Sequence, residues 1–289
     1  MHLFFPLASS ILYVVAALFL KQSASRGVDI WRTAFVCNAM TALLFLCLWP
    51  LGGKPVVIEL LWQPLLVALL FIVAQLMTFL ALKTGDVSVA TPVMGSKVVL
   101  VAVFTTLLGA GTVPLALWAA ALLSTLGIAS LNGKGETRHA NVLRTVWLSL
   151  AAVSAYALFD VLVMSWAPNW GTGRFLPLVM LASGLLSFGF LPLARKGKAS
   201  RAWRDQRPLF FGAVFMSLQA LILVSSMAIY GDATAINVIY STRGLWSVLA
   251  VWWLGHLFGN TERSQGGGVF RSRLFGAACL CASVALVFV

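Results

Sequence analysis

Long apolar segments, separated by short polar links, follow one another along the whole chain. A helix needs about 20 mostly apolar residues to cross the hydrocarbon core of a bilayer. The expected helices span residues 3–20, 33–49, 60–82, 88–108, 114–131, 145–166, 175–194, 208–230, 234–257 and 274–289. The pattern predicts an all-α polytopic membrane protein with ten transmembrane helices.

One part of the helix pattern occurs twice. Residues 85–109 and 231–255 align without gaps, and both begin with Gly-Asp and end with Leu-Gly. In this alignment Ser88 faces Thr234, Ser96 faces Thr242, and Lys97 faces Arg243. A cation in the middle of an apolar segment is costly and marks a functional site by default. The paired cation is therefore the most informative part of the repeat.

The repeat divides the predicted helices into two sets of five. The first and sixth helices also match, because Leu7, Ala8 and Tyr13 have the same spacing as Leu150, Ala151 and Tyr156. Five is odd, so the second set enters the membrane from the opposite side, which makes an inverted repeat of the kind found in alternating-access carriers. We expect a first five-helix repeat over 1–132, a cytoplasmic linker over 133–144 and a second five-helix repeat over 145–289.

The charge pattern adds an orientation. The chain is 61% hydrophobic and only 10% charged, with a net charge of +12, whereas a soluble domain carries about 25% charged residues. Of the 20 lysines and arginines, 16 lie in odd-numbered links, and only Lys54 and Arg174 lie in even-numbered ones. This bias places the odd-numbered links in the cytoplasm and both termini outside. The cations are expected to meet lipid headgroups, and no motif predicts a nucleic-acid partner.

The first apolar segment has no basic region before it, so we expect a permanent helix and not a cleaved signal peptide. After the tight turn at Gly85, Asp86 and Ser88 are expected to cap the fourth helix. A glycine-rich link over 266–268 is expected to be flexible. The expected location is a cell membrane, most simply the bacterial inner membrane.

Lys97 and Arg243 each lie about ten residues into a predicted helix, which is about 15 Å deep at 1.5 Å per residue. Each cation costs on the order of 3 kcal/mol at the membrane centre. Two interpretations remain open: a structural ion pair or carbonyl-capped charge, or two cations that bind an anionic substrate group. Asp160 is the acid well inside a helix, with Tyr156 one turn before it on the same face. Asp160 is expected either to pair with one cation or to carry a proton.

Further polar and aromatic residues are candidates for lining a central cavity. Tyr240, Ser247 and Trp246 lie near Arg243 at helical spacing, and Gln75 and Gln219 lie at comparable heights in the third and eighth helices. Packing in the core or against lipid is the alternative role for the aromatic residues, and linking helices is the alternative for the glutamines.

Signatures of enzymes are absent from the sequence, with no HExxH pair, Gly-x-Ser-x-Gly elbow or phosphate-binding glycine loop. We expect no catalytic residue, cofactor or metal. The cysteines lack CxxC spacing and are expected to be small buried hydrophobes. They are Cys37, Cys47, Cys279 and Cys281.

The segments ALKTGDVSVATPV and AIYGDATAINVI, together with the five-plus-five pattern, resemble the drug/metabolite transporter superfamily of the EamA type. The resemblance covers nearly the whole chain and implies ten helices and carrier activity. Small multidrug-resistance members of that superfamily bind cations with a glutamate in their first helix, whereas residues 3–20 contain no acid. The organelle phosphate-antiport branch binds phosphate with lysine and arginine, and Lys97 and Arg243 are similar in kind.

The sequence thus predicts a secondary-active transporter of a small anionic or zwitterionic metabolite, with a proton as a possible coupling ion. The alternatives are a non-transporting membrane protein, such as an accessory subunit or an intramembrane enzyme, and a flippase for a lipid-linked anionic headgroup. Against an enzyme stands the lack of a nucleophile–base pair, a second buried acid or a metal cluster.

Overall fold

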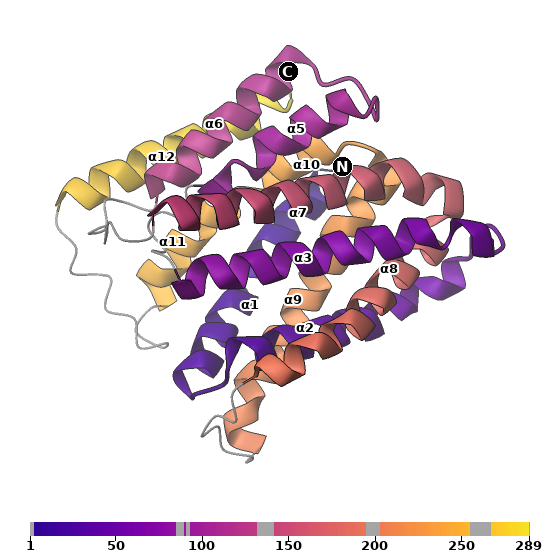
Figure 1. Ribbon diagram of the computed structural model, residues 1–289. Helices are drawn as coiled ribbons and strands as arrows, with labels where there is room; N and C mark the ends of the chain where they lie inside the picture. The colour runs from indigo at the N-terminus through magenta and orange to yellow at the C-terminus, as the bar shows by residue number, and fades with distance from the viewer. Residues whose placement is uncertain are drawn as a thin grey trace. The chain divides into compact units, whose positions relative to one another are not determined.

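The computed structural model describes residues 3–84, 90, 93–131, 142–194, 203–254 and 267–288, and within these ranges every regular element is helical (Figure 1). The first half contains α1 (Phe4–Ser25), α2 (Ile30–Phe45) with η1 (Leu46–Leu51), η2 (Ile58–Leu60), α3 (Trp62–Thr84), α5 (Lys97–Leu107) and α6 (Leu115–Leu131). The second half contains α7 (Val142–Trp170), α8 (Thr172–Leu186) with η4 (Ser187–Leu193), α9 (Trp203–Tyr230), α10 (Ala233–Tyr240), α11 (Arg243–Leu254) and α12 (Gly267–Leu286).

Six of the described helical stretches are long and apolar enough to cross a membrane. They correspond to the first, second, third, sixth, seventh and eighth predicted helices, which confirms the prediction of an all-helical chain with the composition of a multi-pass membrane protein. The stretches are Phe4–Ser25, Ile30–Leu51, Ile58–Ala81, Val142–Trp170, Thr172–Leu193 and Gln206–Tyr230. In the regions of the other four predicted helices, the described apolar helices are shorter, at Val93–Leu107, Leu115–Ser130 and Phe275–Leu286, and the ninth is divided into α10 and α11.

Local sequence explains where several helices begin and end. Asp29 accepts a hydrogen bond from the backbone N–H of Trp31 at 3.0 Å and so starts α2 before Arg32, which we had expected to lie in the preceding link. Asp232 starts α10 in the same way by accepting from the N–H of Ala235 at 2.9 Å. The expected caps Asp86 and Ser88 and most of the 133–144 linker lie outside the described residues.

Two smaller expectations need correction. Gly267 and Gly268 begin α12 and do not form a flexible link, because the helix extends seven residues before its expected start at Leu274. Cys37 and Cys279 are buried as expected, whereas Cys47 and Cys281 are exposed. Both exposed cysteines lie on helix faces that no described helix covers, so an apolar sequence context did not ensure burial.

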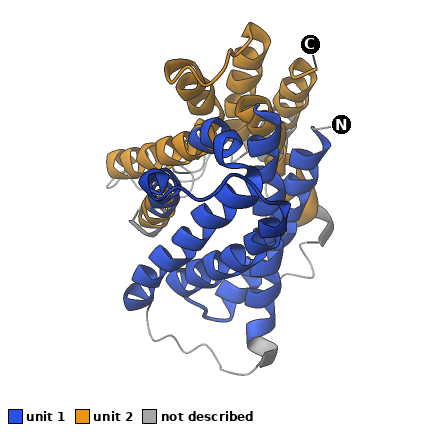
Figure 2. Ribbon diagram, turned by 90° about the vertical axis from the view of Figure 1, so that its right-hand side faces the viewer, with its two compact units in different colours: residues 1–72, 162–231 blue, residues 73–161, 232–289 orange. Residues whose placement is uncertain are grey.

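The helices form two compact units, and each unit draws on both halves of the chain (Figure 2). Unit 1 comprises residues 1–72 and 162–231, and unit 2 comprises residues 73–161 and 232–289. In unit 1, α9 packs against α1 and α2, and α2 packs against α8. In unit 2, α6 packs along α12, and α5 and α10 pack against each other and against α6. Helices α3 and α7 each contribute one segment to either unit.

Small residues bring the helices of unit 2 close together. A Cβ atom on Gly127 of α6 would lie only 2.9 Å from Cγ of Leu280 and 3.0 Å from the carbonyl oxygen of Gly276 on α12. Nearby, Ser124 of α6 and Ser283 of α12 share a buried hydrogen bond of 3.0 Å. Small residues that allow backbones to approach, with polar groups that bond across helices, are typical of packing inside membranes.

Candidate functional site

The candidate site lies in unit 2, where a turn interrupts the predicted fourth helix. Residues 93–95 are helical, Ser96 forms the turn, and α5 begins at Lys97. The backbone N–H of Ser96 donates to the carbonyl of Val93 at 3.0 Å, and its hydroxyl donates to the same oxygen at 2.7 Å. This bond to the third preceding residue is the tighter pattern of a 3₁₀ turn, which within a helix often marks a functional hinge.

The predicted ninth helix has the same turn at the equivalent place. It consists of α10, a turn at Ser241 and Thr242, and α11, which begins at Arg243. The hydroxyl of Thr242 donates to the carbonyl of Ile239 at 2.7 Å, just as Ser96 does to Val93. We had expected continuous helices over 88–108 and 234–257. Instead, each paired cation is the first residue of a helix that follows a turn.

Asp160 of α7 is the charge partner of Lys97. Its Oδ2 lies 2.6 Å from Nζ of Lys97, and the two side chains are 4% and 18% exposed. Asn237 of α10 donates from Nδ2 to the same oxygen at 2.8 Å and to the carbonyl of Ala233 at 2.9 Å. Three helices, α5, α7 and α10, thus meet at one carboxylate, and the pair has no net charge.

The ring of Tyr156 lies one turn before Asp160 on α7, and Nζ of Lys97 is 5.8 Å from the centre of this ring. An ammonium group at this distance from an aromatic face is attracted by the ring quadrupole. Lys97 is therefore a neighbour of both Asp160 and Tyr156, which the sequence already placed on one face of the same helix. Sequence analysis missed Asn237, although an asparagine inside an apolar helix is itself a signal because its amide must find partners there.

Arg243 lies in a different setting. Its guanidinium carbon is 4.5 Å from the centre of the buried Tyr240 ring, one turn earlier in the chain. The hydroxyl of Ser247 donates to the Arg243 carbonyl at 2.6 Å, so this donor serves its own helix. Nε1 of Trp246 is buried and has no hydrogen-bond partner within the described part of the chain. An unsatisfied buried donor beside an arginine favours the binding of an acceptor.

The two glutamines belong to different units. Gln75 is partly buried on the segment of α3 that belongs to unit 2. Gln219 lies in unit 1, where its Oε1 and backbone carbonyl accept from the hydroxyl of Ser9 at 3.1 and 2.9 Å. This contact links α9 to α1, which is the helix-linking alternative for Gln219. Among the described residues, histidine, cysteine, aspartate and glutamate do not gather in groups of three that could hold a metal ion.

Comparisons with known proteins support the fold and name no family. No family model matches the chain, and no curated protein matches it. A solved structure, described simply as "Crystal structure of protein", matches with a TM-score of 0.72 and 14% identity, over 99% of this chain and 96% of that one. At this identity the likeness shows a shared fold over nearly the whole length.

Proposed function

We propose that this chain is a secondary-active transporter that moves a small anionic or zwitterionic metabolite across a cell membrane by alternating access. The proposal includes ten membrane crossings in a five-plus-five inverted repeat, membership of the drug/metabolite transporter superfamily of the EamA type, and a place in the bacterial inner membrane. One observation carries it: the two paired cations each begin a helix after an equivalent turn, and one of them already holds a buried carboxylate.

A helix start attracts anions for two reasons. The helix dipole places about half a positive charge there, and the first N–H groups have no partner within the helix, although that of Gly244 in α11 already donates to the carbonyl of Ser241 in the preceding turn. A lysine or arginine at this position adds a full charge to the same place. At Lys97 the anion that meets this positive charge is the carboxylate of Asp160, at 2.6 Å. The chain therefore contains one example of anion binding at the first of its two turns.

Arg243 is the proposed anchor for the anionic group of the substrate. A planar guanidinium offers several fixed donors to a carboxylate or phosphate, and Trp246 offers another.

The roles of the two cations therefore differ. Lys97 shares its charge with Asp160, so Arg243 is the main anion-binding cation in this proposal and Lys97 the weaker one. A substrate anion that approached Lys97 would compete with Asp160, and an added proton on Asp160 would keep the site neutral. A proton is for this reason the proposed coupling ion. Uptake into vesicles that is unchanged by an imposed pH gradient would exclude it.

The first prediction tests Arg243. Purified protein is screened by thermal shift against metabolite anions, zwitterions and cations, and the dissociation constant of the best ligand is then measured for variants. Arg243→Gln should weaken binding about ten- to a hundredfold, because a charge-assisted hydrogen bond is worth about 1.5–3 kcal/mol. Arg243→Lys should retain part of the affinity, since it keeps the charge and loses the planar fork.

The control is Arg207→Gln, which removes an exposed cation at the start of the membrane segment of α9. This variant should bind as the wild type does. Equal affinity of wild type and Arg243→Gln, or a screen in which only cations raise the melting temperature, would overturn the proposal.

A further inference from the structure

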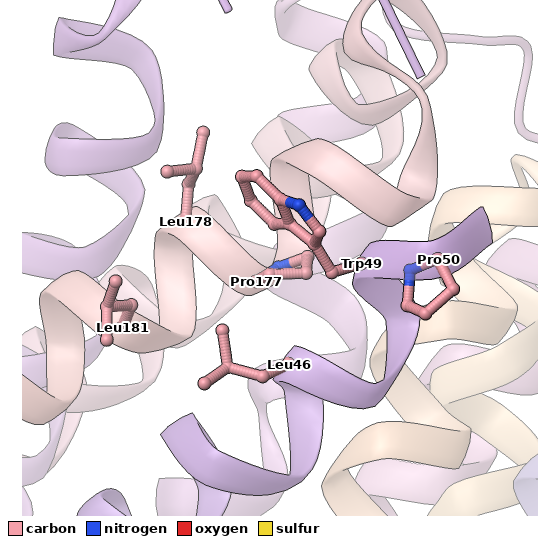
Figure 3. Close-up of a pocket in the computed structure, with 6 residues that line it drawn as sticks. All are labelled: Leu46, Trp49, Pro50, Pro177, Leu178 and Leu181. Atoms are coloured by element: carbon pink, nitrogen blue, oxygen red, sulfur yellow. The ribbon is translucent and has the colours of Figure 1, made fainter. Parts of the chain in front are cut away.

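An apolar groove on unit 1 lies between η1 and α8 (Figure 3). It has a volume of about 520 Å³, which falls in the range of about 300–1,000 Å³ that is usual for ligand sites. Its lining residues are Leu46, Trp49, Pro50, Pro177, Leu178 and Leu181. Leu46, Trp49 and Leu181 are 39%, 40% and 40% exposed, so the groove is open along one side.

The groove belongs to two stretches that can cross a membrane. Leu46, Trp49 and Pro50 lie near the end of the stretch Ile30–Leu51, and the α8 residues lie near the start of the stretch Thr172–Leu193. The groove therefore lies near one end of both stretches, and the end of a membrane-spanning stretch is the level at which hydrocarbon core and headgroups meet. Hydrocarbon contains no water that could fill an open apolar groove, and the molecules that surround such a surface in a bilayer are lipids.

Arg174 does not line the groove, but it contacts the lining residue Trp49. Its guanidinium carbon lies 4.2 Å from the centre of the Trp49 ring, and its Nη1 is 3.5 Å from the Trp49 carbonyl oxygen. A guanidinium has five N–H donors in a planar arrangement, so most of them remain for another acceptor. Tryptophan and arginine at this depth are also the residues that membrane proteins place at the headgroup level.

Close backbone packing fixes this rim. A Cβ atom on Gly173 would lie 2.5 Å from the Gly52 carbonyl oxygen and 2.7 Å from that of Leu48. Gly171 has a φ of +83°, and the N–H of Lys54 donates to the carbonyl of Trp170 at 2.9 Å. The segment that follows η1 and the start of α8 are thus held together, which keeps Arg174 against Trp49.

Charge complementarity indicates the ligand. Lys54 and Arg174 are the two cations that the sequence assigns to even-numbered links, and both belong to these two joined segments. An apolar groove whose lining residue Trp49 carries a guanidinium, with a second cation on the joined segment, matches a molecule that has a phosphate at one end and a hydrocarbon chain at the other. We propose that this groove is a binding site for a phospholipid with an anionic headgroup, with one acyl chain between η1 and α8 and the phosphate at Arg174.

The test uses native mass spectrometry of the full chain in detergent. The dissociation constant of the first bound lipid is measured for phosphatidylglycerol and for phosphatidylcholine with the same acyl chains, and glycerol phosphate serves as the probe without acyl chains. Phosphatidylglycerol should bind more tightly than phosphatidylcholine. Arg174→Gln should weaken its binding about fivefold, the effect expected of one cation near a membrane surface.

Leu181→Trp fills the groove and should weaken the binding of both lipids by at least as much. Its matched control is Leu185→Trp, at a residue of α8 that is 62% exposed and does not line the groove. Arg207→Gln is the control for the loss of a cation. Melting temperatures show whether each variant folds, and Leu178→Trp replaces Leu181→Trp if that variant does not.

Equal affinity of the protein for the two lipids would overturn the proposal. So would variants Arg174→Gln and Leu181→Trp that both bind phosphatidylglycerol as tightly as the wild type does. Binding of glycerol phosphate as tight as that of the lipid would also overturn it, because the site would then belong to a soluble phosphate compound. None of these measurements involves transport, so the lipid site and the proposed function can fail independently.

Discussion

At the scale of single residues, the central feature is a carboxylate that is almost fully buried and satisfied from two directions. Asp160 accepts from Lys97 at 2.6 Å and from Asn237 at 2.8 Å. Two charges removed from water stabilise each other only if the remaining hydrogen bonds are also made, and the loss of one partner leaves the other charge buried alone. Removing one charge should therefore cost more than removing both.

The second prediction is a double-mutant cycle on this pair. Lys97→Met and Asp160→Leu should each lower the free energy of unfolding by about 3–5 kcal/mol, whereas the double variant should be close to wild type or more stable. The measurement is chemical or thermal unfolding in detergent, followed by tryptophan fluorescence. If the two single changes simply add in the double variant, the charges are not coupled.

The residues of this site could be selected from the sequence, but the contact between Lys97 and Asp160 could not be predicted from it. Lys97, Asp160 and Tyr156 were conspicuous because charged or polar groups are expensive inside apolar segments. Which of the two cations would pair with Asp160 depends on how α5, α7 and α10 pack, and that information is spread over residues that are distant in the chain. Asn237 was missed because the search of the apolar segments started from charged residues. A buried amide is neutral, but it also requires hydrogen-bond partners.

At the scale of elements, the two turns matter most. A hydropathy pattern predicts an apolar segment. It contains no information on whether a serine or threonine hydroxyl donates a hydrogen bond to a backbone carbonyl of the same helix. Ser96 and Thr242 do this with the carbonyls of Val93 and Ile239, at 2.7 Å in both cases. Such local bonds compete with helical ones. The sequence alignment already paired Ser96 with Thr242, but it could not reveal that each would end a helix.

The third prediction concerns the close packing of α6 and α12. Gly127→Ala adds a methyl group 2.9 Å from Leu280 and 3.0 Å from a backbone carbonyl that cannot move aside easily. Such overpacking should lower the free energy of unfolding by about 1–3 kcal/mol. Gly189→Ala is the matched control, since its Cβ would meet nothing within 4 Å. Equal melting temperatures of the two variants would show that α6 and α12 do not approach as described.

At the scale of the whole molecule, the long apolar helices could be predicted because about 20 consecutive apolar residues leave few alternatives. The grouping of helices into units could not be predicted. The order of apolar segments along the chain suggests a first and a second half, whereas the contacts join α2 to α8 and α6 to α12, each pair with one member from either half. Such pairings arise from side-chain complementarity between distant segments, which periodicity does not record.

The fourth prediction concerns orientation in the membrane. In a background in which all four cysteines are replaced, Lys54→Cys stands in an even-numbered link and Ser200→Cys in an odd-numbered one. On right-side-out vesicles an impermeant thiol reagent should label Lys54→Cys at once and Ser200→Cys only after permeabilisation, because the cation bias places the odd-numbered links in the cytoplasm. The reverse order of labelling would invert the topology.

The packing of α1 against α9 has a consequence for how the protein is made. Ser25 ends α1 and Trp203 begins α9, so α1 leaves the ribosome about 180 residues before its main partner, which is roughly 10–35 s of translation at 5–20 residues per second. During that time α1 and α2 must wait in the lipid or beside the insertion machinery with Ser9 and Thr41 lacking the partners that α9 later supplies. Neither half of the gene encodes a unit that can finish folding alone, so an assembly factor that shelters unpaired helices would act chiefly on the nascent first half.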